Sequence, residues 1–127
     1  MRFSKTDKIL IAWIIIVFIG IALPSDDIPD INPVVNFDKI VHMILFGVVT
    51  FLMNGSLTLR GFTRRSAAII GLLAGSAYAG LAEIIQLFVP GRSCSIYDFY
   101  AGVIGALIAL IIAHFIKIGY AKSSGET

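Results

Sequence analysis

Charged residues divide this chain into long apolar segments. No Asp, Glu, Lys or Arg occurs in residues 9–25, 40–59 or 99–116, and residues 66–91 contain a single charged residue, Glu83. A membrane-spanning helix needs about 20 mostly apolar residues, with a range of roughly 17 to 25. The pattern therefore predicts an all-α polytopic membrane protein. We expect one domain over residues 1–127, a bundle of four transmembrane helices with short loops, spanning about residues 9–25, 40–58, 67–89 and 99–117.

The composition supports this fold class. Hydrophobic residues make up 57% of the chain and charged residues 14%, whereas soluble domains carry about 25% charged residues. The first segment follows several basic residues, as in a signal peptide, but "IALPSDD" offers no small-x-small cleavage site. We therefore expect a retained first helix, with Ser4 and Asp7 forming a start that resembles a capping box.

The basic residues predict the orientation of the bundle. Eight of the ten Lys and Arg residues lie in the N-terminal segment, the middle loop or the C-terminal segment, and the other two loops hold only Lys39 and Arg92. Basic residues concentrate on the cytoplasmic side of membrane proteins, so both termini are expected inside. Topology also accounts for the net charge of +2, and we expect no nucleic-acid partner.

Small residues recur every four positions in the last two predicted helices. The third helix carries Gly71, Gly75 and Ala79, and the fourth carries Ala101, Gly105, Ala109 and Ala113. Such rows let helix backbones approach closely in lipid. We expect the third and fourth helices to pack tightly against each other as a hairpin.

The polar residues that topology does not explain all fall at the predicted outer end of the bundle. They are Asp38, His42, Glu83, Gln86, Arg92 and Asp98. Because they come from three separate regions of the sequence, their convergence at one membrane face predicts a functional site there.

Glu83 is the most informative of these residues. It lies six residues before Val89, or about 9 Å below the expected end of its helix. An acid within hydrocarbon costs about 2.5–3.5 kcal/mol on insertion scales, so it should face the bundle and find a partner. That partner is His42, Gln86 or Arg92, or else the carboxyl group stays protonated. A purely structural role remains an alternative.

The other polar residues also have structural interpretations. Asp38 can stabilise the first turn of its helix, and Ser95 with Asp98 matches a capping box. His42 can form a hydrogen bond between helices. The fork of Arg92 suits a phosphate or a carboxylate, or it supports a neighbouring acid.

The sequence contains no strong catalytic or metal-binding motif. Asp38, His42 and Glu83 are plausible metal ligands, but their spacing matches no zinc pattern, so we expect no metal and no cofactor. Neither a nucleophile elbow nor a phosphate-binding loop occurs. The single cysteine, Cys94, excludes an internal disulfide.

Two segments, "DKIVHMILFG" and "AEIIQLFVPGRSCSIYDFYAGVIGAL", together resemble the VanZ-like family of small bacterial membrane proteins. The resemblance covers roughly residues 36–109. The matching positions are Asp38, Lys39, His42, Glu83, Gln86, Pro90, Gly91, Arg92, Ser95, Asp98 and Gly105. One position departs from the pattern: the family often has Asn where this chain has Gly102, which would leave a less polar site or a gap filled by water.

The resemblance implies a multi-pass protein of the bacterial cytoplasmic membrane, and the namesake of the family is associated with resistance to teicoplanin-type glycopeptides. It supplies no reaction. The favoured hypothesis is an outward-facing site that binds a membrane lipid headgroup, a lipid-linked cell-wall precursor or an amphiphilic antibiotic. In it, Arg92 clamps the anion and Lys39 assists.

Two other hypotheses remain. The first is an enzyme acting on a lipid-linked substrate at the outer leaflet, with His42 as general base and Glu83 as acid. The second is proton or cation transport through the bundle. The inner halves of the third and fourth helices carry no matching polar residues, which argues against transport. Whether the protein is an enzyme and whether it forms a homo-oligomer stay open.

Overall fold

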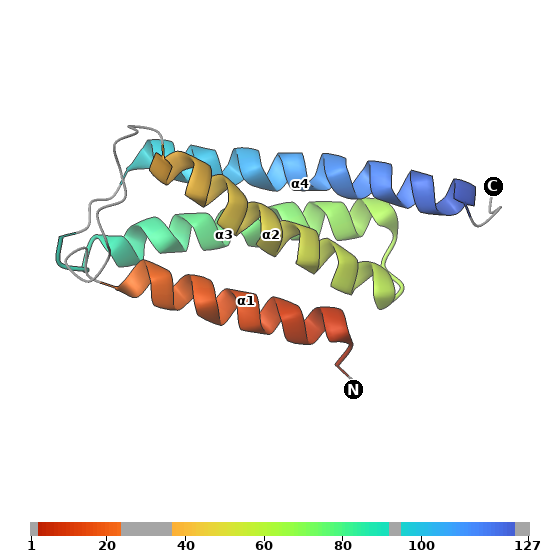
Figure 1. The fold of residues 1–127 in the computed structure, drawn as a ribbon, viewed down its shortest axis with the longest axis horizontal. Coiled ribbons are helices and arrows are strands. Elements are labelled where there is room, and N and C mark those ends of the chain that lie inside the picture. The colour runs from red at the N-terminus through yellow and green to blue at the C-terminus, as the bar shows by residue number, and fades with distance from the viewer. Residues whose placement is uncertain (1–2, 24–36, 92–94, 124–127) are drawn as a thin grey trace.

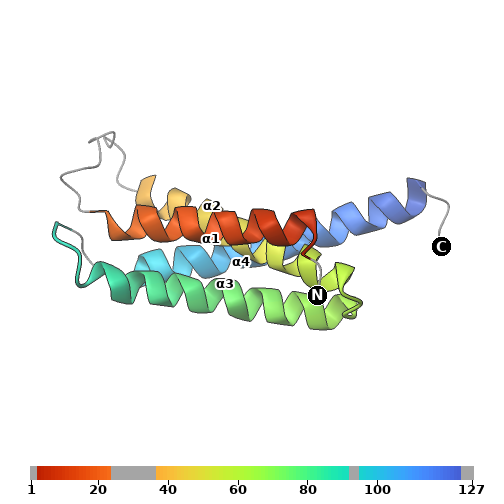
Figure 2. The ribbon, with the colours of Figure 1, turned by 90° about the horizontal axis from the view of Figure 1, so that it is seen from below.

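The computed structural model describes residues 3–23, 37–91 and 95–123. Within these residues the chain forms four helices: α1 (Lys5–Ala22), α2 (Phe37–Leu59), α3 (Arg64–Gln86) and α4 (Ile96–Ser123). The helices run alternately in opposite directions along one bundle, so both ends of the chain lie at the same end as the α2–α3 turn (Figure 1). Figures 1 and 2 show that α4 continues past the other helices at this end.

Local sequence explains where the helices begin. The backbone N–H of Ser4 donates to Asp7 Oδ2 at 2.8 Å and the N–H of Asp7 donates to Ser4 Oγ at 3.1 Å, which confirms the predicted capping box. Thr63 caps α3 by accepting the N–H of Ser66 at 3.1 Å. Between α2 and α3 the chain reverses at Gly61, whose φ of +92° is accessible to glycine at little cost.

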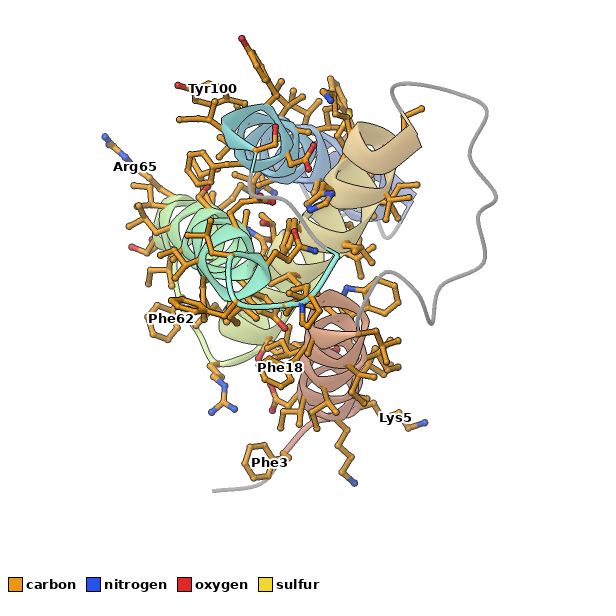
Figure 3. All side chains as sticks on the ribbon, turned by 90° about the vertical axis from the view of Figure 1, so that its left-hand side faces the viewer. Phe3, Lys5, Phe18, Phe62, Arg65 and Tyr100 are labelled. Carbon is orange, nitrogen blue, oxygen red and sulfur yellow. The ribbon has the colours of Figure 1, made fainter. Side chains whose placement is uncertain are left out.

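Three of the described helices are long and apolar enough to cross a membrane: Lys39–Leu59, Arg64–Gln86 and Ile96–Ile116. The 18-residue α1 is shorter and carries three charged residues near its start. Large apolar side chains cover the outside of the bundle, and Figure 3 shows Tyr100 pointing away from it. This surface agrees with a helical membrane protein.

Helices α2 and α4 approach so closely that their backbones touch. A Cβ atom on Gly47 would lie 2.9 Å from the carbonyl oxygen of Gly105, and one on Gly105 would overlap the backbone of Met43. Only glycine fits this contact, which explains why the apolar α4 contains Gly105 at this point.

Two glycines of α3, Gly71 and Gly75, also face α2. A Cβ on Gly71 would lie 3.3 Å from the carbonyl oxygen of Thr50, and one on Gly75 would lie 3.3 Å from that of Phe46. The expected α3–α4 hairpin is therefore only part of the packing. The two helices do meet at Ala79 and Gly102, but the small residues of both helices mainly allow close contact with α2, which lies against all three other helices.

Two hydrogen bonds attach α1 to this core. The indole Nε1 of Trp13 donates to the carbonyl oxygen of Leu45 at 3.0 Å. The hydroxyl of Tyr78 donates to the carbonyl oxygen of Ile14 at 2.7 Å. Beneath them, Phe46 is fully buried and packs edge-on against Tyr78 with ring centroids 5.6 Å apart. These contacts fix α1 against α2 and α3.

Candidate functional site

Glu83 lies in the last turn of α3. This helix ends at Gln86 rather than near Val89, because a residue before proline avoids the helical region and Pro90 follows. A turn at Pro90–Gly91 follows the helix, with Gly91 at a φ of +76°. Glu83 is thus about 4.5 Å from the end of its helix, not about 9 Å, yet only 4% of its surface is exposed.

The carboxylate of Glu83 joins three elements of the bundle. Its Oε1 lies 3.2 Å from Nε2 of His42 on α2, and its Oε2 accepts the backbone N–H of Ser95, just before α4, at 3.0 Å. His42 is itself buried, with its ring 5.7 Å from that of Phe46. Of the partners considered for Glu83, the structure therefore places His42 beside it.

Asp98 lies in the first turn of α4 and faces α2. Its Oδ1 is 3.8 Å from Nζ of Lys39, and the two side chains are 13% and 38% exposed, respectively. A capping box would direct the N–H of Ser95 to Asp98, but that N–H is donated to Glu83 instead. The Asp98 carboxylate is thereby available to groups on α2.

Three side chains that can ligate a metal come together at this point. One ligand atom each from His42, Glu83 and Asp98 can be chosen such that all three lie within 4.8 Å of one another. Asp38 was predicted as a possible ligand beside the first two, but its side chain lies outside the described residues. The same holds for all of Arg92.

Of the other predicted site residues, Lys39 and Ser95 contact the group, and Gln86 is buried one turn beyond Glu83. The structure thus brings residues of α2, α3 and the start of α4 together at one end of the bundle. We refer to Lys39, His42, Glu83, Ser95 and Asp98 as the polar cluster.

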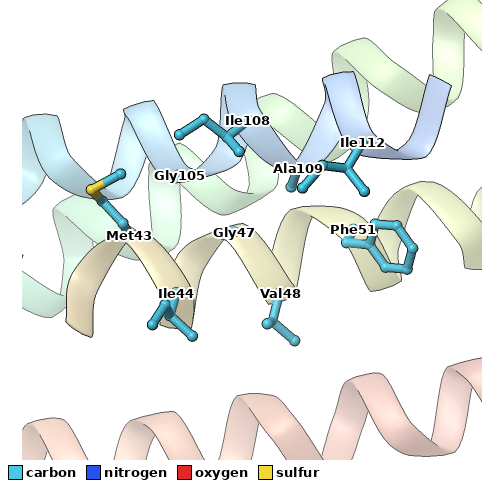
Figure 4. A pocket seen from close by; sticks show the side chains of 9 residues that line it. All are labelled: Met43, Ile44, Gly47, Val48, Phe51, Gly105, Ile108, Ala109 and Ile112. Carbon is cyan, nitrogen blue, oxygen red and sulfur yellow. The ribbon is translucent and has the colours of Figure 1, made fainter. Parts of the chain in front are cut away.

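An apolar groove runs beside the polar cluster, between α2 and α4 (Figure 4). It has a volume of about 330 Å³ and is lined from α2 by Met43, Gly47 and Phe51, among others, and from α4 by Gly105, Ile108 and Ile112, among others. No pattern in the sequence predicts this groove. It exists because the two glycines bring the helix axes together while the larger side chains on either side stand apart.

Lys39 and Asp98 lie at one end of the groove. Lys39 precedes Met43 by four residues and Asp98 precedes Gly105 by seven, so each shares a helix face with a groove residue. The groove therefore leads from an apolar surface to a pair of opposite charges.

A second set of buried polar residues lies at the opposite end of the bundle. Oδ1 of Asp7 accepts the hydroxyl of Ser56, and its Oδ2 lies 3.0 Å from Nη2 of Arg60. The hydrogen bond from Ser56, followed by the one from the backbone of Ser4, lowers the pKa of Asp7 from 3.8 to about 2. This set was not predicted from the sequence, where Asp7 had an explanation as part of a helix cap and Arg60 as part of the basic middle loop.

A sequence model of the VanZ/LLP1 family matches residues 3–117. This chain belongs to the VanZ/LLP1 family. The match confirms the resemblance carried by residues 36–109 and extends it through α1. A similar protein is the uncharacterized protein C11E3.10 of the fission yeast Schizosaccharomyces pombe, 27% identical over 116 residues, which are 88% of this chain and 66% of that protein. No solved structure matches the chain.

Gly102 is the position at which this VanZ/LLP1 protein departs from the pattern. A Cβ atom there would lie 2.8 Å from Cβ of Ala79 and 3.1 Å from Cδ2 of Phe46. The expected alternative of a water-filled gap is therefore not supported, because apolar groups occupy the space. The polar cluster ends at Asp98, one turn earlier on α4.

Proposed function

We propose that this VanZ/LLP1 protein crosses the cytoplasmic membrane of a bacterium four times, with both termini inside. The basic residues of the described chain support this orientation. Lys5, Lys8, Arg60, Arg64 and Arg65 lie at the end of the bundle that holds both termini, and Lys39 lies at the other end. The hydrogen bonds of Trp13 and Tyr78 support including α1 among the spans, because they fix it along the other helices.

The outward end then carries the function, which we propose to be binding of an anionic amphiphile. The observation that carries this proposal is the Lys39–Asp98 pair at the end of the apolar groove. An apolar chain can lie between α2 and α4, while an anionic headgroup pairs with Lys39. A membrane lipid, a lipid-linked cell-wall precursor and an amphiphilic glycopeptide antibiotic share this combination of groups.

Lys39 can exchange its partner Asp98 for an anionic ligand. Lys39 is 38% exposed and 3.8 Å from Asp98, so it can turn toward an incoming phosphate at little cost. Arg92 is three residues before Ser95, whose N–H is held by Glu83. The planar fork of Arg92 suits a bidentate contact to the same anion.

Native mass spectrometry of the detergent-solubilised protein tests this proposal with phosphatidylglycerol and phosphatidylcholine of equal acyl chains. The wild type should retain phosphatidylglycerol preferentially. Lys39→Gln should reduce the preference about fivefold, since one basic residue near a headgroup is worth about 1 kcal/mol. Lys5→Gln is the matched control at the opposite end and should leave the preference unchanged.

Two further variants separate the headgroup from the chain. Ile108→Trp should fill the groove and lower retention of both lipids, whereas Arg92→Lys should weaken only phosphatidylglycerol binding because the bidentate contact is lost. Equal retention of the two lipids by the wild type, or an unchanged preference in Lys39→Gln, would remove lipid headgroups as the ligand.

A second candidate function is catalysis on a lipid-linked substrate at the outer leaflet. The buried His42–Glu83 pair, at 3.2 Å, favours it, because a histidine held by a carboxylate is a common general base. Ser95, whose backbone N–H binds Glu83, carries the hydroxyl that would act as nucleophile. Incubation of the purified protein with labelled envelope lipids tests this candidate, and absence of any product counts against it.

A third candidate, proton or cation transport, has weaker support. Thr50 continues the row of His42 along α2, and Asn54 follows four residues later. The fully buried ring of Phe46 lies between His42 and Thr50, which argues against a continuous polar path. A flux assay in liposomes distinguishes transport from binding.

A further inference from the structure

We propose that His42, Glu83 and Asp98 form a binding site for a divalent transition-metal ion, with Zn²⁺ as the best fit. This proposal replaces the expectation of no metal, which rested on sequence spacing alone. The three side chains come from α2, α3 and α4, so their proximity is a property of the tertiary structure. Their ligand atoms lie within 4.8 Å of one another.

The buried carboxylate of Glu83 supplies an independent observation. Oε1 of Glu83 lies 3.2 Å from Nε2 of His42 but accepts no hydrogen bond from any described residue, although the side chain is 4% exposed. A buried polar atom without a hydrogen bond is costly and calls for an explanation. A cation between Oε1 and Nε2 would bind both atoms through their lone pairs.

The distances are close to those of a metal centre. Bonds of about 2.0–2.2 Å in a tetrahedral zinc site place neighbouring ligand atoms about 3.3–3.6 Å apart. The separation of 3.2 Å between His42 and Glu83 is close to that range without any movement. The ligand atom of Asp98, in the first turn of α4, lies within 4.8 Å of the other two, so it has to move roughly 1 Å closer to complete the set.

The kinds of ligand indicate the class of ion. Imidazole favours zinc, iron, nickel and copper, whereas carboxylates also accept manganese and magnesium. One imidazole and two carboxylates therefore suit a first-row divalent ion of intermediate hardness. Two carboxylates also neutralise the charge of Zn²⁺, which lowers the cost of burial. Lys39 must turn away from Asp98 on binding, and its partly exposed side chain permits this.

The surroundings of Glu83 resemble the support that metal ligands receive in proteins. The backbone N–H of Ser95 holds Oε2 at 3.0 Å and leaves Oε1 directed toward His42. Such hydrogen bonds orient ligating carboxylates. Three protein ligands leave a fourth position on the ion for water or for a phosphate oxygen of the amphiphile. Only the binding of that phosphate oxygen rests on the proposed function.

Metal titration of untagged, chelator-stripped protein tests the site. Zn²⁺ binding is measured by calorimetry, and Co²⁺ binding by the visible absorption that a low-symmetry cobalt site gains. We expect about one ion per chain. His42→Gln and Glu83→Gln should each weaken binding at least about tenfold. His114→Gln is the matched control, because His114 is the other histidine of the chain and is exposed near the far end of α4.

A second variant guards against loss of folding. Asp98→Asn changes a side chain at the edge of the cluster and should keep the fold, as checked by gel filtration, while weakening Zn²⁺ at least about tenfold and altering the Co²⁺ spectrum. Absence of metal binding in the wild type, or binding as tight as that of the wild type in folded Asp98→Asn and His42→Gln, overturns the proposal. A lipid preference that persists in the chelated, metal-free protein would then leave the headgroup proposal standing.

Discussion

Gly47 of α2 and Gly105 of α4 pack backbone against backbone. A Cβ on Gly47 would lie 2.9 Å from the carbonyl oxygen of Gly105, closer than real Cβ atoms come to any neighbour. This contact lies along the groove and one to two turns from the polar cluster. The spacing of the two helices, and hence the distance from Lys39 to Asp98, depends on it.

Gly105→Ala should therefore destabilise the bundle. The added methyl group overlaps the backbone of Met43, and such overpacking costs about 1–3 kcal/mol. Gly20→Ala is the control: nothing lies within 4 Å of its Cβ, and alanine is favoured over glycine in a helix by about 1 kcal/mol. Thermal unfolding in detergent measures both variants. An equally stable Gly105→Ala protein would contradict the close contact.

The stability of the protein should fall in acid through Asp7. Its pKa is about 2 in the folded chain against an ordinary value of 3.8, so the carboxylate stabilises the fold fully above about pH 4. That contribution is lost as the pH falls from about 4 to below 2, where the carboxylate is protonated in both states. Melting temperatures over this range measure the effect.

Asp7→Asn should flatten this pH dependence, and Ser56→Ala should reduce it by removing the hydrogen bond that lowers the pKa most. Lys8→Gln, next to Asp7 but exposed, is the control and should keep the wild-type slope. The same slope in Asp7→Asn as in the wild type would show that other groups cause the acid sensitivity.

The orientation can be tested with the single cysteine. Cys94 should react with a membrane-impermeant maleimide in intact cells, because the loop before α4 is predicted to lie outside. In a Cys94→Ser background, Phe62→Cys places a thiol in the exposed α2–α3 turn, which should react only after lysis. The reverse pattern would invert the topology and place the polar cluster in the cytoplasm.

Antibiotic susceptibility tests whether the phenotype of the family's namesake extends to this chain. In a Gram-positive host, the wild-type chain should raise tolerance to teicoplanin. Glu83→Gln, at a matched membrane level, should not, because it removes the carboxylate that lies 3.2 Å from His42 and joins α2 to α3. Equal tolerance in both strains would indicate that the polar cluster has another role, and lipid or metal binding would then be the readout to follow.

The sequence by itself determined the helices and the family. Stretches free of charge are a local property, and their lengths match the width of a membrane, so the long apolar helices followed directly. The start of α1 at Ser4 is local as well, because a cap acts within a few residues. The family followed from the joint order of polar residues around α2 and α3.

Tertiary structure alone decided which side chains meet. Apolar helices of this kind are hydrophobic on nearly every side, so periodicity does not reveal which face turns inward. The structure shows that α2 is the helix against which both small-residue rows pack, and that Asp98 joins His42 and Glu83. It also pairs Asp7 with Ser56, 49 residues away. These contacts depend on how closely and at what rotation the helices pack, which is set by their mutual fit.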